Sequence, residues 1–223
     1  MKKSLRVGGE ALARRVCGRS SRPLSIRATV GVALGGSALY GVALGWFETL
    51  STGKALHVLI TAVKSPLLLA TTAALTLPAV GAVTLALRGR AVLVPFLRSL
   101  ADSHAAAGLV LASLAPLVLV AYTAIERQRE AILVNLLAFA VASIAGHVVL
   151  RRRLRERLGA FSGLRPILML WFALYSFVGI QAGWMLRPFV LGPYEQPALL
   201  RERWATNGYL GLLRIIEADD HVD

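Results

Sequence analysis

The chain has 223 residues, of which 56% are hydrophobic, and it carries a formal net charge of +13. This composition is far from that of an average soluble domain. In a soluble protein the charge would suggest nucleic-acid binding. The sequence has no zinc-finger spacing and no basic patch with interleaved aromatics, so we expect no nucleic-acid partner. The single cysteine, Cys17, excludes an internal disulfide and a multi-cysteine metal site.

The N-terminal segment, residues 1–27, is rich in arginine and serine, and Glu10 is its only acid. This composition fits a basic cytoplasmic tail before a first membrane span, and it equally resembles a mitochondrial presequence. The apolar run that begins at Ala28 is long, and no small-residue cleavage site follows it closely. A cleaved secretory signal peptide is therefore not expected. We therefore predict a basic cytoplasmic tail, with the presequence as the alternative.

Five long apolar runs without Asp, Glu, Lys or Arg follow this segment. Each has the ~20 residues that a helix needs to cross a hydrocarbon core of ~30 Å. They lack the apolar–polar alternation of membrane barrel strands. The sequence therefore predicts an all-α integral membrane bundle of about five transmembrane helices over residues 28–190, with short interfacial helices and an extracytoplasmic tail over residues 191–223. The runs cover residues 28–47, 66–87, 105–125, 131–150 and 166–186.

Two stretches beside these runs are apolar but short. A single helix over residues 55–87 would be about 50 Å long, so we expect a break at Lys64-Ser65-Pro66, with Ser65 as N-cap and Pro66 as the first helical residue. Residues 55–63 then form an interfacial or re-entrant helix, and Lys64 extends to the headgroups. Residues 91–100 are expected to form a second interfacial helix, on the cytoplasmic side.

The lysines and arginines predict the orientation. With a cytoplasmic N-terminus, 17 of the 25 would lie inside and 8 outside, and this asymmetry favours N-inside and C-outside. The frequent Ala, Gly and Arg suit a bacterial inner membrane. Anionic lipid headgroups are the expected partners of the basic cytoplasmic segments, among them Arg90 and Arg98.

Small residues recur at helical spacing inside the runs, where they permit close helix packing in lipid. We expect packing within the monomer, with homo-oligomer contact as the alternative. We also expect Pro78 and Pro116 to kink their helices. The small residues are Ala33, Ser37, Gly41 and Gly45, with Gly31 and Gly35 beside them, Ala138, Ala142 and Gly146 in the fourth run, and Gly179 and Gly183 in the fifth.

Polar residues inside the runs are the candidate functional groups. Asn135, Ser143 and His147 share one helical face, and Gln181 lies in the fifth run. They could pass protons or bind a substrate, or they could form interhelical hydrogen bonds. No run contains an acidic residue, which disfavours an ion-coupled transporter. Asp102-Ser103-His104 has the residue types of a catalytic triad, but contiguous residues cannot readily adopt its geometry. We expect no catalytic, cofactor or metal site.

Two motifs resemble those of a family of bacterial multi-pass membrane proteins with K-x-P-L-L and G-x-Q-x-x-W-x-L-R-P-F elements. The five-span layout is also similar to that of the Yip1 group of trafficking proteins. We interpret the second motif as a structural corner in which Gln181 binds a buried polar partner, and we expect it to lie at the same outer membrane face as Lys64. The motif residues are Lys64, Pro66, Gly179, Gly183, Trp184, Arg187 and Pro188.

The sequence favours a non-enzymatic membrane subunit or scaffold that anchors a partner complex, with a membrane-protein partner or a homo-oligomer. The alternative is a transporter, channel or permease component for a small solute, using the polar residues of the fourth run and Gln181. A third class, an enzyme acting on lipid or isoprenoid, would need acidic residues at one face. Its poor candidates are Glu48, Glu126 and Glu130.

Overall fold

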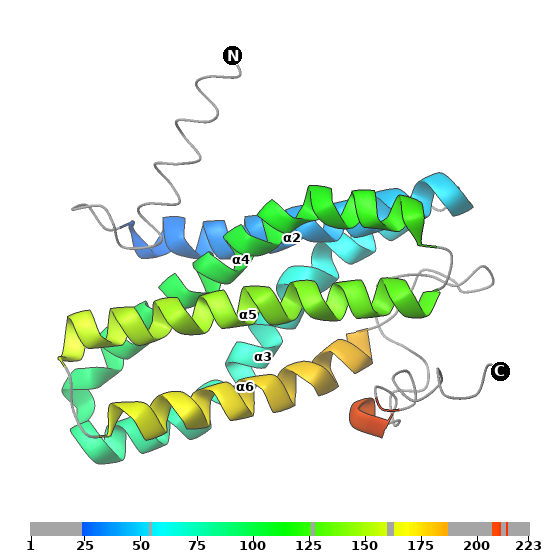
Figure 1. Ribbon diagram of the computed structural model, residues 1–223. Coiled ribbons are helices and arrows are strands. Elements are labelled where there is room, and N and C mark those ends of the chain that lie inside the picture. The colour runs from blue at the N-terminus through cyan, green and yellow to red at the C-terminus, as the bar shows by residue number, and fades with distance from the viewer. Residues whose placement is uncertain are drawn as a thin grey trace.

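The computed structural model describes residues 24–53, 55–125, 128–159, 163–186, 207–210 and 213. The protein is an all-α bundle, and five of its helices are long and apolar enough to cross a membrane (Figure 1). The helices are α2 (Ile26–Thr52), α3 (Leu56–Arg88), α4 (Leu93–Ala124), α5 (Gln128–Leu158) and α6 (Leu164–Leu186), with a short 3-10 helix, η1 (Arg90–Val92), before α4. The five predicted runs fall on these helices.

The prediction of a break at Lys64-Ser65-Pro66 is wrong. Helix α3 runs without interruption through Pro66 and Pro78, and its 33 residues correspond to about 50 Å. Proline removes one backbone hydrogen bond, but membrane helices tolerate it where neighbouring elements support the chain. Here α2 gives that support, because a Cβ atom on Gly41 would overlap the backbone of Thr61 and Ala62. Residues 55–63 are therefore not a separate interfacial helix.

The prediction of an interfacial helix over residues 91–100 is also wrong. Only η1 is separate, and from Leu93 onward the segment belongs to α4. Two of its apolar side chains, Phe96 and Leu100, pack inside the protein, where they join one buried cluster with Leu154 of α5 and Trp171 of α6. Protein packing thus continues the third helix beyond the predicted span.

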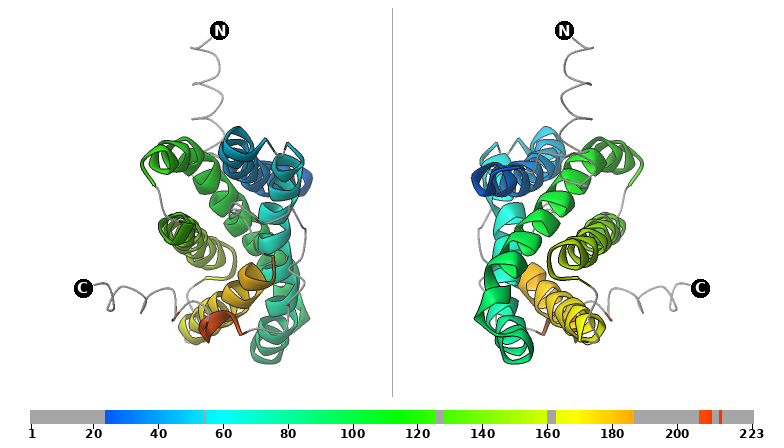
Figure 2. Two further views of the ribbon diagram at one scale, coloured as in Figure 1. Left: turned by 90° about the vertical axis from the view of Figure 1, so that its right-hand side faces the viewer. Right: turned by 90° about the vertical axis from the view of Figure 1, so that its left-hand side faces the viewer.

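Helix α2 packs against α3 and α4, whereas α5 rests mainly on α4 and α6 mainly on α3. Seen end-on, α5 and α6 lie at the periphery of the bundle (Figure 2). The helices alternate in direction, so that the starts of α2, α4 and α6 share one end with the ends of α3 and α5 (Figure 1). We name this the arginine-rich end, since its exposed residues include Arg27, Arg90, Arg98, Arg151, Arg152, Arg155 and Arg165.

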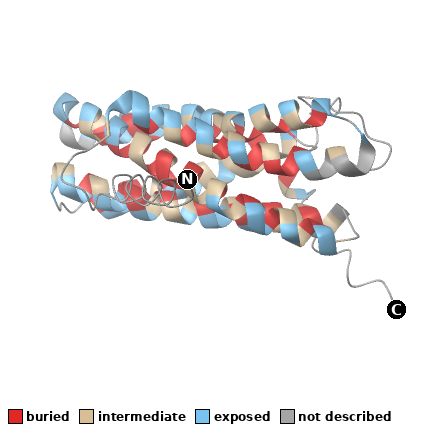
Figure 3. Ribbon diagram, turned by 90° about the horizontal axis from the view of Figure 1, so that it is seen from above, coloured by how far each residue is buried: buried red, intermediate tan, exposed pale blue. Residues whose placement is uncertain are grey.

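Buried residues line the helix faces that are turned toward one another, and exposed residues cover the outside (Figure 3). Several of the predicted small-residue contacts occur within the monomer. Gly41 and Gly45 adjoin α3, Gly146 adjoins Ser103 of α4, and Gly179 adjoins Thr72 of α3. The pair Gly31 and Gly35 differs, because an added Cβ at either position would meet no atom of the described residues within 4 Å.

Candidate functional site

A small polar cavity lies where α4, α5 and α6 meet. Its volume is about 20 Å³, slightly more than the roughly 10–15 Å³ that one water molecule requires. Two histidines and two serines on neighbouring helices contribute to its wall, together with aromatic side chains of α6. The lining residues are Ser103, His104, Ala107, Ser143, Gly146, His147, Trp171, Phe172 and Tyr175.

His104 is oriented by its own helix. Its Nδ1 lies 2.9 Å from the carbonyl oxygen of Leu100. A carbonyl only accepts, so Nδ1 carries the proton and, in the neutral ring, Nε2 carries a lone pair. That Nε2 is buried and has no hydrogen-bond partner among the described residues. The ring also packs edge-on against Tyr175 of α6, with centroids 5.6 Å apart.

His147 reaches the same cavity from α5. Its Nδ1 is likewise buried without a hydrogen-bond partner in the described part of the chain, and its ring packs edge-on against Phe172 at 5.0 Å. A Cβ on Gly146 would lie 3.0 Å from the backbone oxygen of Ser103, so glycine allows α5 to approach α4 closely here. A buried polar atom normally has a partner or an ordered water. One water in this cavity could serve both imidazoles.

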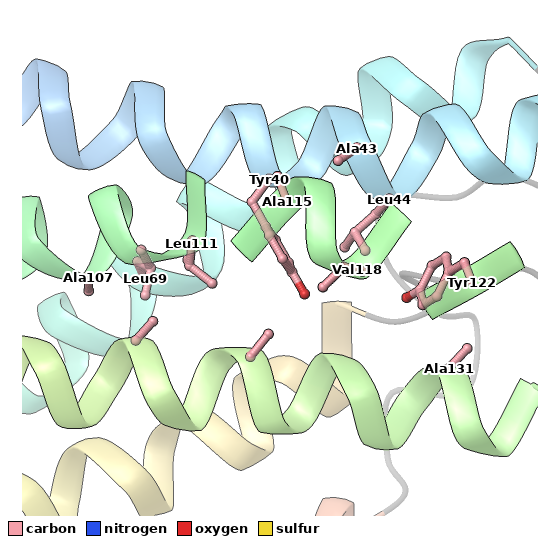
Figure 4. Close-up of a cluster of buried hydrophobic side chains, with 12 residues drawn as sticks. Tyr40, Ala43, Leu44, Leu69, Ala107, Leu111, Ala115, Val118, Tyr122 and Ala131 are labelled. Atoms are coloured by element: carbon pink, nitrogen blue, oxygen red, sulfur yellow. The ribbon is translucent and has the colours of Figure 1, made fainter. Parts of the chain in front are cut away.

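Ser143 and His147 line the cavity together, but Asn135 lies elsewhere. It forms a separate buried network in which Tyr40 Oη donates to Asn135 Oδ1 at 2.7 Å and Asn135 Nδ2 donates to Tyr122 Oη. Figure 4 shows the two tyrosine side chains projecting from α2 and α4 toward α5. Asn135 therefore ties three helices together and does not extend the cavity.

An ion cluster lies beside the cavity, toward the arginine-rich end. Asp102 accepts from Arg157 at 2.7 Å and lies 3.2 Å from Arg153. Arg157 also donates to Ser99 at 3.0 Å. Asp102 thus joins α4 to the end of α5, while the adjacent Ser103 and His104 line the cavity.

The first motif lies inside the bundle. Lys64 is fully buried, so the expectation that it extends to the headgroups is wrong. The close approach of α2 along this stretch of α3 encloses it. Ser65 is also fully buried, and its hydroxyl has no hydrogen-bond partner among the described residues. Pro66 lies within α3 and does not begin a helix.

The second motif uses two sides of α6. Gly179 and Gly183 face α3, where their Cβ positions would lie 3.5 Å from Thr72 and 3.9 Å from Leu68. Gln181 instead accepts the backbone N–H of Gly208 at 3.0 Å. Leu68, one turn after Lys64, shares a buried cluster with Ala182 and Leu186. This end of α6 therefore lies near the first motif.

Trp184 adjoins the same C-terminal segment, since a Cβ added to Gly208 would lie 2.8 Å from the Cβ of Trp184. Arg187 and Pro188 fall outside the described residues, as do Glu126 and most of the tail over residues 191–223. Glu48 belongs to α2. The role of Arg187 and Pro188 in the predicted structural corner therefore stays a prediction.

Three residues of the site were not predicted from the sequence: the two tyrosines that bond to Asn135, and His104 in the cavity. Tyr40 and Tyr122 stand inside apolar runs, and a buried tyrosine hydroxyl usually has a partner. That signal could have paired them with Asn135. His104 directly precedes the predicted third span over residues 105–125. It lies in the cavity because α4 begins twelve residues before that span, at Leu93.

Comparison of the chain with protein-family models, with curated proteins and with solved structures finds no match. In the described ranges, no group of three or more His, Cys, Asp or Glu side chains is arranged to hold a metal ion. The chemistry that the site offers is hydrogen bonding to one small polar molecule, and proton exchange through the two imidazoles.

Proposed function

We propose that the protein is a non-enzymatic subunit or scaffold that assembles with another membrane protein. The observation that carries the proposal is the open glycine pair Gly31 and Gly35 on α2. Wherever two helices of this bundle approach most closely, a glycine makes room: Gly36 and Gly108 between α2 and α4, and Gly41 between α2 and α3. Small residues serve such contacts in lipid, and a pair with no neighbour among the described residues favours a helix of a partner.

The peripheral helices support this reading. In the apolar stretch of each candidate span, the residues buried inside the protein make up 44%, 39% and 44% for α2, α3 and α4. The corresponding share is only 22% for α5 and for α6. Large apolar side chains on their outer faces, such as Leu137, Val148 and Phe177, are therefore available to lipid or to a partner. The two bacterial motifs favour an inner membrane. The arginine-rich end favours a cytoplasmic location for that end, next to anionic lipid headgroups.

The test is purification of the tagged protein from its native membrane in mild detergent, followed by mass spectrometry and size analysis. We expect a stoichiometric partner, or a defined homo-oligomer. Gly35→Leu should abolish the association, because it fills the face of α2 on which an added Cβ meets no described atom within 4 Å. Ala74→Leu, on an exposed face of α3, is the matched control and should retain the partner. A monomer without a partner, or equal binding by both variants, would refute the proposal.

Transport is the second candidate, and the His104–His147 cavity favours it. Two imidazoles on adjacent helices beside one water-sized cavity could pass a proton within the membrane. His104→Ala and His147→Ala should then each abolish proton flux into reconstituted vesicles, measured with an enclosed pH-sensitive dye. Ser113→Ala, on an exposed side of α4, should leave flux unchanged. If neither histidine variant lowers flux, this candidate fails.

A further inference from the structure

A short C-terminal segment, residues 207–210, packs alongside the last half of α6 (Figure 1). The Gly208 N–H donates to Gln181 Oε1 at 3.0 Å. The Tyr209 hydroxyl donates to the backbone carbonyl of Phe177, and the two rings stack with centroids 4.9 Å apart. The segment is thus held by polar and aromatic contacts to one helix.

Gly208 makes the approach possible. It is buried, and a Cβ at this position would lie 2.8 Å from Trp184 Cβ and 3.0 Å from Gln181 Oε1. The next backbone donor is also used, because the Tyr209 N–H bonds to Asn207 Oδ1 at 3.0 Å. Both backbone N–H groups therefore have a partner within the protein, as backbone groups at membrane depth require.

These contacts place the segment beside the second half of α6 and not beyond its last residue. Phe177 precedes Leu186, the last residue of α6, by nine positions, which corresponds to about 14 Å along a helix. The whole of α6 is a candidate membrane span, and this distance is about half the thickness of a hydrocarbon core of ~30 Å. The contact at Phe177 therefore lies at membrane depth. Beyond Tyr209, Leu210 and Leu213 are 55% and 50% exposed, as expected for side chains in contact with lipid tails.

We infer that residues 207–210, together with Leu213, lie in the membrane beside α6 and contact lipid acyl chains through Leu210 and Leu213. For these residues, this differs from the expected extracytoplasmic tail over residues 191–223. It also assigns a role to the second motif, in which Gln181 and Trp184 contact the segment at Gly208. The inference is independent of whether the protein assembles with a partner.

Depth-dependent fluorescence quenching tests it. In a Cys17→Ser background, Leu210→Cys is labelled with an environment-sensitive fluorophore and reconstituted into phosphatidylcholine–phosphatidylglycerol vesicles. We expect quenching by lipids that carry a spin label on the acyl chain, and protection from aqueous iodide. Leu137→Cys on the exposed face of α5 is the deep reference, and Ala55→Cys before α3 is the aqueous reference. Iodide quenching as strong as at Ala55 would overturn the inference. Protection from iodide without acyl-chain quenching would overturn it too, since the residue would then be enclosed by protein.

A second variant tests the docking itself. Gly208→Val forces a side chain against Trp184, so we expect a several-fold rise in iodide quenching of the Leu210 label. Ala140→Val, a matched change on an exposed face of α5, should leave the quenching unchanged. Equal quenching in the two variants would show that the segment is not held by α6.

Discussion

At the residue scale, Asn135 shows how one polar side chain joins three apolar helices. It accepts from Tyr40 and donates to Tyr122, and all three side chains are buried. Replacing it with leucine leaves two tyrosine hydroxyls without this partner. We expect Asn135→Leu to lower the free energy of unfolding by about 1–3 kcal/mol, measured by denaturation in detergent.

The tyrosines supply the control. If the loss comes from the network, Asn135→Leu should cost clearly less in a protein that already carries Tyr40→Phe and Tyr122→Phe. The double-mutant cycle separates this coupling from the effect of side-chain volume. An equal cost in both backgrounds would show that packing of Asn135, and not hydrogen bonding, stabilises the bundle.

Glycine substitutions distinguish filled helix contacts from open ones. Gly41→Ala places a methyl group against the backbone of Thr61 and Ala62, whereas Gly35→Ala meets nothing within 4 Å. Overpacking costs about 1–3 kcal/mol, while alanine is about 1 kcal/mol better than glycine in a helix. We therefore expect Gly41→Ala to lower the thermal unfolding temperature of the purified monomer, and Gly35→Ala to leave it unchanged or raise it. The reverse order would contradict the α2–α3 contact.

At the scale of the element, the end of α5 is held by charge. Asp102 and Arg153 are 14% and 13% exposed in the pair that joins α4 to α5. Without the Asp102 carboxylate, the half-buried positive charges of Arg153 and Arg157 lose their negatively charged partner on α4. Asp102→Asn should therefore lower the free energy of unfolding by about 2–3 kcal/mol. Chemical denaturation at low salt is the measurement.

Glu156 provides a matched comparison on the same helix. Its carboxylate lies 2.8 Å from Arg152 and 3.1 Å from Arg153, but the Glu156 side chain itself is 40% exposed, and pairs of exposed charges contribute about 0–1 kcal/mol. Glu156→Gln should therefore have a small effect. Equal losses in the two variants would mean that burial does not govern these ion pairs.

Helix α3 shows why element boundaries were harder to predict than elements. Serine followed by proline is typical of a helix start, and the length of residues 55–87 argued against one helix. The structure continues through Pro66 because the glycines of α2 bring a second helix against the same stretch. Such support depends on tertiary packing, which the local pattern does not contain. We expect Pro66→Ala to leave the fold intact and the thermal unfolding temperature equal or higher.

At the scale of the whole molecule, the five apolar runs were sufficient to predict the all-α class, since their length and lack of charge are direct physical requirements of a span. The cavity was not predictable in the same way. Ser143 and His147 share a face by helical periodicity, but their partners His104 and Tyr175 lie on other helices. Which faces meet is decided by packing between helices, and neither spacing nor composition encodes it.

The orientation of the bundle is the last prediction, and it follows from charge at that same scale. Exposed arginines concentrate at the end that holds η1 and the end of α5, and basic segments remain on the cytoplasmic side. Ala55 and Ala91 are exposed alanines near opposite ends, so they form a matched pair of reporters. In a Cys17→Ser background, a membrane-impermeant maleimide should label Ala55→Cys in intact spheroplasts and Ala91→Cys only after permeabilisation. Labelling in the opposite order would reverse the orientation, because the alternating helices fix the two ends relative to each other whatever the identity of the partner.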